Sequence, residues 1–411
     1  MNTVIRYGIK TLIILGLSVL GGVLLLVLVF LLPVQEMKEN AKRSTEIYDY
    51  EDVYPQLMWG YKMSQLDNVT DATMILSAIF PGSGNVIDDA MKVSRIEYRD
   101  KVQVDSLTDY ANDAEGETYT ISYPRYWHGY LVILKPLLLL FDVADIRIGS
   151  MFLLFGSLTC IILLMQKTEL DHYILPFGAS FLLMNPVAIP LSFQFSAVSY
   201  IMLLSVWIVL NRNVWKFEKL FFFFMLIGIA TAYFDFLTFP LVGLYFPMIF
   251  ILMKEKSWGN AIKIVILGSI AWIIGYAGMW SGKWLIGSVL TGENFFQSAL
   301  ARANEYSDWE NVTLPELVWR NVRVLVKWPI IIAGTEIILW KGKNILKAVK
   351  EYQTFLKGMI PFVIIAIAPF VWYVAAGMHS YIHYWFTYRE LCVSVFAVLA
   401  GLWKAIDYHS M

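Results

Sequence analysis

The stretch "YPRYWHGYLVILKPLLLLFDVADIRIG", residues 123–149, decides how the chain is arranged, because a membrane span inside it would reverse the side on which every later loop lies. Its apolar run, residues 128–141, is shorter than the ~20 residues that a helix needs to cross a bilayer. Lys135 and Pro136 also interrupt the run. We predict a helix that lies in, or dips into, the outer leaflet, with its aromatic flank at the interface. A short tilted span within a bundle is the alternative.

The composition restricts the class of protein. With 58% hydrophobic and 16% charged residues over 411 positions, the chain has too few charges to cover a water-facing surface, which predicts an all-α polytopic membrane protein. A net charge of -1 and the lack of a basic stripe speak against a nucleic-acid partner. Cys160 and Cys392 both lie in apolar segments, so neither is placed for a disulfide in an aqueous loop.

Hydropathy predicts about ten transmembrane helices. The chain then divides into a first transmembrane helix at 1–32, an extracytoplasmic loop with amphipathic, interfacial helices at 33–145, and a transmembrane bundle at 146–411. A second outer loop is predicted at 281–327. The spans that we predict within the bundle are 147–165, 173–190, 195–210, 220–235, 239–253, 264–280, 328–340, 358–376 and 389–403.

The distribution of Lys and Arg gives the orientation, because short cytoplasmic loops carry the excess of both. If residues 128–141 do not cross, the basic residues near both termini and in alternate loops fall on one side, and the short connections on the other side contain none. We therefore predict a multi-pass plasma (inner) membrane protein with cytoplasmic termini and an extracytoplasmic active site. The connections without Lys or Arg are 191–194, 236–238 and 377–388.

The layout resembles the GT-C superfamily of integral-membrane glycosyltransferases, which includes protein mannosyltransferases and aminoarabinose transferases. The opening stretch carries the local resemblance: a Tyr-rich, Pro-containing lead, an interfacial helix, an acidic turn, then Arg147 and Ser150 at the start of a span. The resemblance implies sugar transfer from a polyprenyl-phosphate donor to a cell-envelope glycan or lipid acceptor, among membrane lipids. It also implies a catalytic acid in the first outer loop. The segment "PVQEMKENAKRSTEIYDYEDVYPQ", residues 33–56, departs from the family pattern, so position alone does not assign that acid.

The catalytic candidates are carboxylates. A sugar phosphate is already activated, so one base that takes the proton of the acceptor hydroxyl suffices for an inverting single displacement. Asp71 and Asp67, in "QLDNVTDATMILSAIF" (residues 65–80), share one face if this segment is helical. Helix capping is the competing role for both. Asp235, at the end of an apolar span, is the second choice after this pair.

Cations at the outer face are candidates for binding the donor phosphate, where negative charge grows as the bond breaks. Anchoring by aromatic residues, or an ion pair of Arg389 with Glu390 or Asp235, would be a purely structural alternative. We predict Arg389, Arg125, His128, Lys135 and Arg147 for the phosphate, and His379, His383 and Tyr388 for donor or acceptor contacts.

Cofactor requirement stays open in the sequence. No His/Cys spacing predicts zinc. Asp88 and Asp89 would suit a divalent cation, with a surface turn as the competing interpretation.

Two other functions also stay open: a flippase or transporter of lipid-linked saccharides, and an O-antigen-type polymerase or ligase. Transporters often contain repeated halves with broken helices, and here "MNPVAIPLSF", residues 184–193, is a Pro-broken stretch without an obvious counterpart.

Overall fold

A computed structural model describes residues 3–212, 215–307, 312–350 and 352–408. It is 78% helical, which confirms the helical class. The prediction of a purely α-helical chain was wrong in one detail, since the first loop also contains a two-stranded antiparallel sheet. Strand β1 (Arg95–Tyr98) pairs with β2 (Thr118–Ile121), with Arg95 opposite Ile121.

Within the described residues, 7 helical segments are long and apolar enough to span a membrane. The predicted segments at 239–253, 328–340 and 389–403 are helical but do not belong to this set. They correspond to α12 (Leu241–Lys254), α16 (Trp328–Lys350) and α20 (Leu391–Tyr408). The 7 candidate spans are Ile5–Phe30 in α1 (Thr3–Phe30), α7 (Val143–Lys167), Asp171–Leu191 with α8 (Ile174–Leu183) and α9 (Ala188–Leu191), α10 (Phe193–Leu210), α11 (Phe217–Phe234), α13 (Trp258–Thr291) and Phe355–Ala376 in α17 (Tyr352–Ala376).

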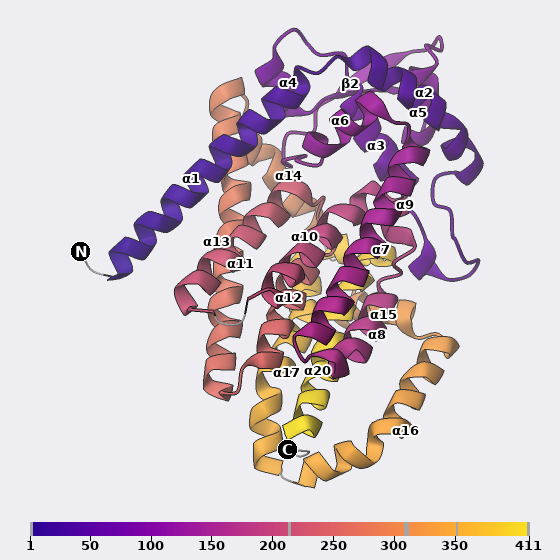
Figure 1. The fold of residues 1–411 in the computed structure, drawn as a ribbon. Coiled ribbons are helices and arrows are strands. Elements are labelled where there is room, and N and C mark those ends of the chain that lie inside the picture. The colour runs from indigo at the N-terminus through magenta and orange to yellow at the C-terminus, as the bar shows by residue number, and fades with distance from the viewer. Residues whose placement is uncertain (1–2, 213–214, 308–311, 351, 409–411) are drawn as a thin grey trace.

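The segment between α1 and α7 folds into a cap over one end of the helix bundle (Figure 1). Its helices pack on one another and on α1 and α13. We call this segment, residues 34–141, the cap. Its helices are α2 (Val34–Glu51), α3 (Asn68–Ala78), α4 (Val86–Lys92), α5 (Gln103–Ala111) and α6 (Leu131–Leu140).

Helix α6 is the apolar run of the opening stretch. It has 10 residues, so at 1.5 Å per residue it is about 15 Å long, half the thickness of a hydrocarbon core. Leu131, Leu134 and Leu138 are buried against the cap, while Ile133 and Leu140 are exposed. The helix is therefore an element of the cap and not a span of the bundle.

The direction of α1 supports the same conclusion. Lys10 pairs with Glu218 at 2.6 Å near the start of α1 and α11, and Tyr233 donates a hydrogen bond to the Gly22 carbonyl at 2.9 Å near their other ends. The two helices therefore run in the same direction. Three spans lie between them in the chain, namely α7, the 171–191 segment and α10. Because each span reverses the direction of the chain, three intervening spans make α1 and α11 parallel, as observed. A crossing by α6 would make four intervening spans, and α1 and α11 would then be antiparallel.

The second predicted loop begins inside a helix. Helix α13 continues to Thr291, beyond the boundary that we predicted at residue 281 from polarity. Lys283, which interrupts the hydropathy there, is fully buried and donates to the Met91 carbonyl at 2.8 Å. The helix can therefore continue through Lys283, because a backbone carbonyl inside the protein accepts the hydrogen bond of its ammonium group.

The rest of that loop contains two further helices, α14 (Phe295–Ser307) and α15 (Leu314–Leu325). Helix α15 is amphipathic. Leu317 and Val324 are buried on one side of it, while Arg323 is exposed. The helix thus has the two unlike faces that its sequence predicts for a surface position.

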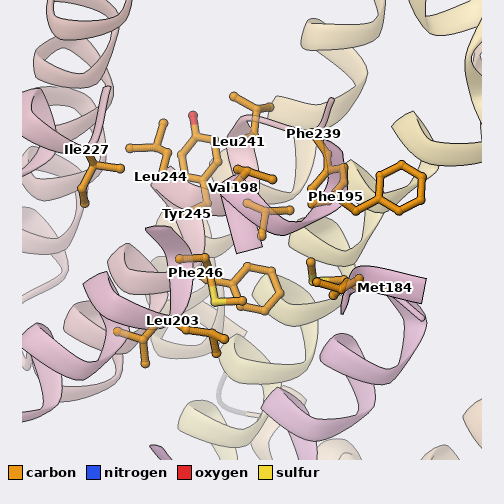
Figure 2. Packing of buried hydrophobic residues seen from close by; sticks show 14 of the residues in the cluster. Met184, Phe195, Val198, Leu203, Ile227, Phe239, Leu241, Leu244, Tyr245 and Phe246 are labelled. Carbon is orange, nitrogen blue, oxygen red and sulfur yellow. The ribbon is translucent and has the colours of Figure 1, made fainter. Parts of the chain in front are cut away.

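The bundle core is aromatic and aliphatic. Phe195 of α10 lies 6.2 Å from Phe239, just before α12, and Phe246 of α12 belongs to the same buried cluster (Figure 2). All the residues of α12 from Leu241 to Met253 are buried. Helix α12 is thus enclosed by protein.

Helices α11 and α13 approach each other through glycine. A Cβ atom added at Gly275 would lie 2.1 Å from the Met225 carbonyl oxygen, and one added at Gly228 would lie 2.2 Å from the Trp272 carbonyl oxygen. Both neighbours are backbone atoms, which cannot rotate away. Small residues permit this close contact between membrane helices.

Replacing Gly275 with Ala should therefore destabilise the protein. We expect a loss of about 1–3 kcal/mol, the usual cost of overpacking, seen as a lower melting temperature of the detergent-purified protein. Gly156→Ala on α7 is the matched control, because a Cβ atom there has no neighbour within 4 Å. Equal melting temperatures for the two variants would contradict the described packing of α11 on α13.

Candidate functional site

Asp67 and Asp71 lie at the start of α3 and join it to α10. Asp67 caps α3 by accepting a hydrogen bond from the Thr70 backbone N–H at 3.0 Å, and it also accepts one from the Gln194 amide at 3.0 Å. Asp71 accepts from the Phe193 N–H at 3.0 Å and from the Ser192 hydroxyl at 3.1 Å. The capping role therefore holds for Asp67, while Asp71 occupies the N-terminus of a different helix, α10.

Burial changes the acidity of both carboxyl groups. Asp67 is 2% exposed and Asp71 is 0% exposed. Desolvation raises the pKa of Asp71 to about 7, even though the positive charge of Arg147 and the Phe193 N–H oppose the shift. Desolvation raises the pKa of Asp67 to about 6, against the hydrogen bonds from Thr70 and Gln194. A base is most effective when its pKa is near the working pH, which favours Asp71.

Stability and base function should respond to pH in opposite directions. From about pH 4 to about pH 7 the folded state binds more protons at Asp71 than the unfolded state, whose carboxyl group has an ordinary pKa. The free energy of unfolding contributed by this group therefore falls as pH rises through that window. The ionised fraction that acts as a base grows over the same window.

We expect this slope to be visible in thermal melts. The melting temperature should decrease between about pH 5 and about pH 7, and Asp71→Asn should make that decrease smaller. The slope should not vanish, because the raised pKa of Asp67 contributes in the same direction. An unchanged slope in Asp71→Asn would show that this carboxyl group does not titrate in the window.

Arg147 lies beside this pair but is already bonded. Its guanidinium forms a two-pronged ion pair with Glu51, at 2.7 and 3.0 Å, and reaches the Asn68 side chain at 3.5 Å. It also lies over the Tyr48 ring. The structure thus places Arg147 near Asp71, as a positive charge with its own carboxylate partner.

Arg389 is buried without a carboxylate. Its side chain has no exposed surface, and its guanidinium lies 4.2 Å from the centre of the Phe195 ring. Nε donates to the Met184 carbonyl at 2.8 Å and Nη1 donates to the Trp385 carbonyl at 3.4 Å. Within the described residues, Nη2 has no hydrogen-bond partner and no ion pair involves this arginine.

Neither carboxylate that the sequence offered as a partner is bonded to Arg389. Glu390 caps α12 by accepting from the Leu241 N–H at 3.1 Å. Asp235 closes a short turn by accepting from the Thr238 N–H at 3.0 Å, and burial raises its pKa to about 6. Asp235 thus stands in the loop next to Arg389, in a turn that it stabilises itself.

The residues before Arg389 face the same region. Tyr388 donates to the Met63 carbonyl at 3.2 Å, and the rings of His379 and His383 are 4.7 Å apart. Burial lowers the pKa of His379 to about 3 and that of His383 to about 4, so both imidazoles are neutral at pH 7. Of the three residues predicted for donor or acceptor contacts, Tyr388 contacts Arg389, whose guanidinium lies 5.0 Å from its ring centre, while His379 and His383 contact Phe386.

A ring contact links this segment to the cap. The Trp385 ring lies 5.5 Å from that of Tyr54, whose pKa rises to about 12 through burial and the negative charge of Asp67. Among the described residues, the indole N–H of Trp385 is buried without a partner. We call Asp67, Asp71, Arg389 and the connecting residues 184–195 the acid–arginine cluster.

The other predicted phosphate ligands lie elsewhere. Lys135 is buried behind the opposite end of α3, where it donates to the Ala78 carbonyl at 2.6 Å, and burial lowers its pKa to about 8. Arg125 and His128 belong to an aromatic group beside α13, which shares no polar contact with Asp71 in the described structure. The structure thus separates the predicted ligands into three places: Arg389 and Arg147 near the two Asp residues, Lys135 at the end of α3, and Arg125 with His128 beside α13.

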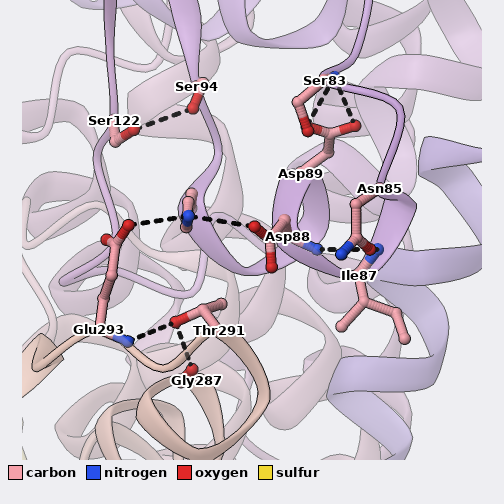
Figure 3. A network of polar contacts seen from close by, with 11 residues as sticks. Ser83, Asn85, Ile87, Asp88, Asp89, Ser94, Ser122, Gly287, Thr291 and Glu293 are labelled. Carbon is pink, nitrogen blue, oxygen red and sulfur yellow. Dashed lines mark hydrogen bonds and ion pairs between the residues drawn. The ribbon is translucent and has the colours of Figure 1, made fainter.

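The acidic pair near α4 is bonded within the protein. Asp89 accepts twice from the Ser83 N–H at 3.0 Å, and Asp88 pairs with Lys92 at 3.1 Å (Figure 3). Lys92 pairs in turn with Glu293 at 2.8 Å. No group of three or more His, Cys, Asp or Glu side chains suited to a metal occurs in the part of the chain that the structure describes.

Sequence reasoning missed the residues that join the cluster. Gln194, Ser192 and Phe193 contact the two Asp carboxylates, and Met184 contacts Arg389. All four lie in the Pro-broken stretch "MNPVAIPLSF" or next to it. That break was the available signal, because a Pro-broken membrane helix leaves backbone groups that polar side chains must satisfy.

Comparisons with known proteins leave the structure as the basis for function: no protein-family model matches this chain, and neither the curated proteins nor the solved structures contain a match.

Proposed function

We propose that this chain is an integral-membrane glycosyltransferase with about ten spans, which transfers a sugar from a polyprenyl-phosphate donor to an envelope glycan or lipid acceptor. The reaction takes place where the cap meets the helix bundle, on the extracytoplasmic side. The observation that carries the proposal is the acid–arginine cluster. It holds a buried carboxylate with a pKa of about 7 and a buried arginine that lacks a carboxylate, both bonded to residues 184–195.

Each group has one task in the proposed reaction. The acceptor oxygen attacks the anomeric carbon, the bond from that carbon to the phosphate oxygen breaks, and the acceptor proton passes to Asp71. The Ser192 hydroxyl now donates to Asp71 at 3.1 Å. An acceptor hydroxyl that replaces it would be at hydrogen-bond distance from the base.

The phosphate product keeps the electron pair of the broken bond. Arg389 binds this phosphate through Nη2, the guanidinium nitrogen that has no acceptor within the described residues. A charged guanidinium that is held in place before the reaction stabilises the growing negative charge without reorganisation. Asp67 orients Gln194 and the start of α3, so it is a positioning residue.

Transfer and translocation are distinguished by an assay on the purified full chain in proteoliposomes. The probe is a polyprenyl phosphate that carries a radiolabelled sugar, with envelope lipid extract as the acceptor. The proposal expects label in a product that no longer carries the polyprenyl chain. Movement of intact donor between leaflets without such a product would instead identify a flippase.

The side on which the cap lies is tested by cysteine labelling. In a background with Cys160 and Cys392 replaced by Ser, we expect Ser122→Cys and Asp142→Cys to react with an impermeant maleimide added outside the cell. Lys256→Cys, in the turn between α12 and α13, should react only after permeabilisation. Protection of Asp142→Cys until permeabilisation would overturn the orientation.

A further inference from the structure

A second group of cations lies on the other side of residues 235–239 from Arg389. Phe236 in this loop stacks on Tyr126 at 4.8 Å between ring centres, whereas Phe239 lies 6.2 Å from Phe195 and next to Arg389. One short loop therefore contacts both places. The aromatic rings around Phe236 are Tyr123, Tyr126, His128 and Tyr130.

Two arginines flank the Tyr123 ring. The guanidinium of Arg125 lies 4.2 Å from the ring centre and that of Arg95 lies 5.6 Å from it. Arg95, 8% exposed, pairs with Glu97 through Nε at 2.5 Å. Within the described residues, Nη1 of Arg95 and Nε of Arg125 are buried without an acceptor. In the described structure, Arg95 and Arg125, from different segments, thus each have an unpaired N–H donor beside the Tyr123 ring.

The charges here do not balance. Lys283 adds a third cation, with its ammonium 5.4 Å from the Trp127 ring, while Glu97 is the carboxylate that pairs with this group. His128 does not add charge. Burial holds its pKa well below the usual range, despite the hydrogen bond to Tyr123, and the charges of Lys283, Arg95 and Arg125 act in the same direction as burial.

The hydrogen bonds of His128 agree with a neutral ring. Nε2 donates to the Tyr123 carbonyl at 2.7 Å, which leaves Nδ1 as the acceptor for the Tyr130 hydroxyl at 3.1 Å. Buried cations in excess are costly unless an anion joins them, and an unsatisfied guanidinium N–H adds to that cost. A bound phosphate would supply the missing negative charge and accept from the guanidinium N–H groups of Arg95 and Arg125 that lack an acceptor within the described residues.

We propose that Arg95 and Arg125 bind a phosphate group of the acceptor, carried by a saccharide or by a lipid, with Lys283 contributing its charge. The term acceptor rests on the proposed function, whereas the anion site itself does not. The donor phosphate at Arg389 and this second phosphate lie on opposite sides of residues 235–239. The aromatic rings beside Arg125 offer apolar faces for a sugar ring next to the phosphate.

Binding is measured by calorimetry on the full chain in phosphatidylcholine nanodiscs, with glucose 1-phosphate as the soluble probe. Nanodiscs that contain phosphatidic acid serve as the lipid probe, with melting temperature as the readout. We expect Arg125→Gln to weaken binding at least about tenfold, as for a lost charge-assisted hydrogen bond. Arg99→Gln changes an exposed arginine that directly follows β1 and pairs with Glu117, and this variant should bind as wild type does.

Further variants separate the site from misfolding and from Arg389. Arg125→Lys should restore part of the affinity, and Arg95→Gln with Glu97→Gln should weaken binding without leaving a buried carboxylate unpaired. Binding of glucose 1-phosphate assigns the phosphate to a saccharide, and a response to phosphatidic acid alone assigns it to a lipid. No binding of either probe, or binding that Arg389→Gln abolishes and Arg125→Gln leaves intact, would overturn the inference.

Failure of this inference differs from failure of the proposed function. Binding that depends on Arg125, in a protein without sugar transfer, keeps the anion site and removes the transferase. Transfer in which Arg125→Gln leaves the acceptor KM unchanged keeps the transferase and removes the assignment of this phosphate to the acceptor. If Arg125→Gln also leaves the binding of both probes unchanged, the anion site is removed as well.

Discussion

Asp71→Asn is expected to lower the rate of sugar transfer by about 10²- to 10⁴-fold, the usual contribution of a positioned general base. The amide has nearly the same shape, and its oxygen still accepts from the Phe193 N–H, which the carboxylate now does at 3.0 Å. The amide cannot take a proton from the acceptor. Donor KM should change little, because no described contact joins Asp71 to the proposed phosphate ligand Arg389.

Two controls separate loss of the base from loss of a cap. Asp67→Asn should reduce transfer less, because Asp67 caps α3 and orients Gln194, and the amide oxygen of Asn can still accept from the Thr70 N–H. Asp142→Asn alters the N-terminal cap of α7, where the Asp142 carboxylate accepts from the Asp145 N–H, and should leave transfer unchanged. If Asp71→Asn were fully active, or if Asp67→Asn had the larger effect, Asp71 would not be the base.

Arg389→Gln is expected to lower kcat by about 10²- to 10³-fold, as when one donor to a developing anion is removed. The loss should appear mainly in kcat, because the phosphate charge increases in the transition state. Arg389→Lys should recover little activity, since an ammonium cannot keep the Met184 contact and also present a second, fixed donor.

The melting temperature distinguishes this effect from a folding defect. Removing a buried cation that has no carboxylate partner leaves no opposite charge stranded, so Arg389→Gln should lose only the packing of the side chain and its bonds to the Met184 and Trp385 carbonyls, and should still unfold in one cooperative transition. Arg323→Gln, on the exposed face of α15, is the matched control and should keep wild-type kcat. Normal turnover in Arg389→Gln would remove this residue from the site.

The sequence predicted the local part of the cluster. An Asp–Asn–Val–Thr–Asp start to an apolar run predicts that Asp67 and Asp71 share one face of a helix, and α3 begins at Asn68. Charge distribution and length predicted that residues 128–141 do not cross, in agreement with the 10-residue α6 and with the parallel course of α1 and α11. The start of α3 and the short length of α6 are both determined by residues that are close together in the sequence.

The sequence could not predict contacts between distant segments. The bonds from Gln194 to Asp67 and from Arg389 to Met184 depend on how α10 and the segment before α20 pack, which periodicity does not report. Strands β1 and β2 have 4 residues each, too few for a recognisable alternation. Hydropathy predicted a span that ends at residue 280, yet α13 continues to Thr291, with Lys283 buried and donating to the Met91 carbonyl.

The anomeric configuration of the product tests the central claim most directly. One carboxylate base with no covalent intermediate requires a single displacement, so the sugar must be inverted relative to the polyprenyl-phosphate donor. Nuclear magnetic resonance of the product, from a donor of known configuration, measures this in one step. We predict complete inversion. Retention of configuration would require a nucleophilic residue and would contradict the assignment of Asp71 as a base.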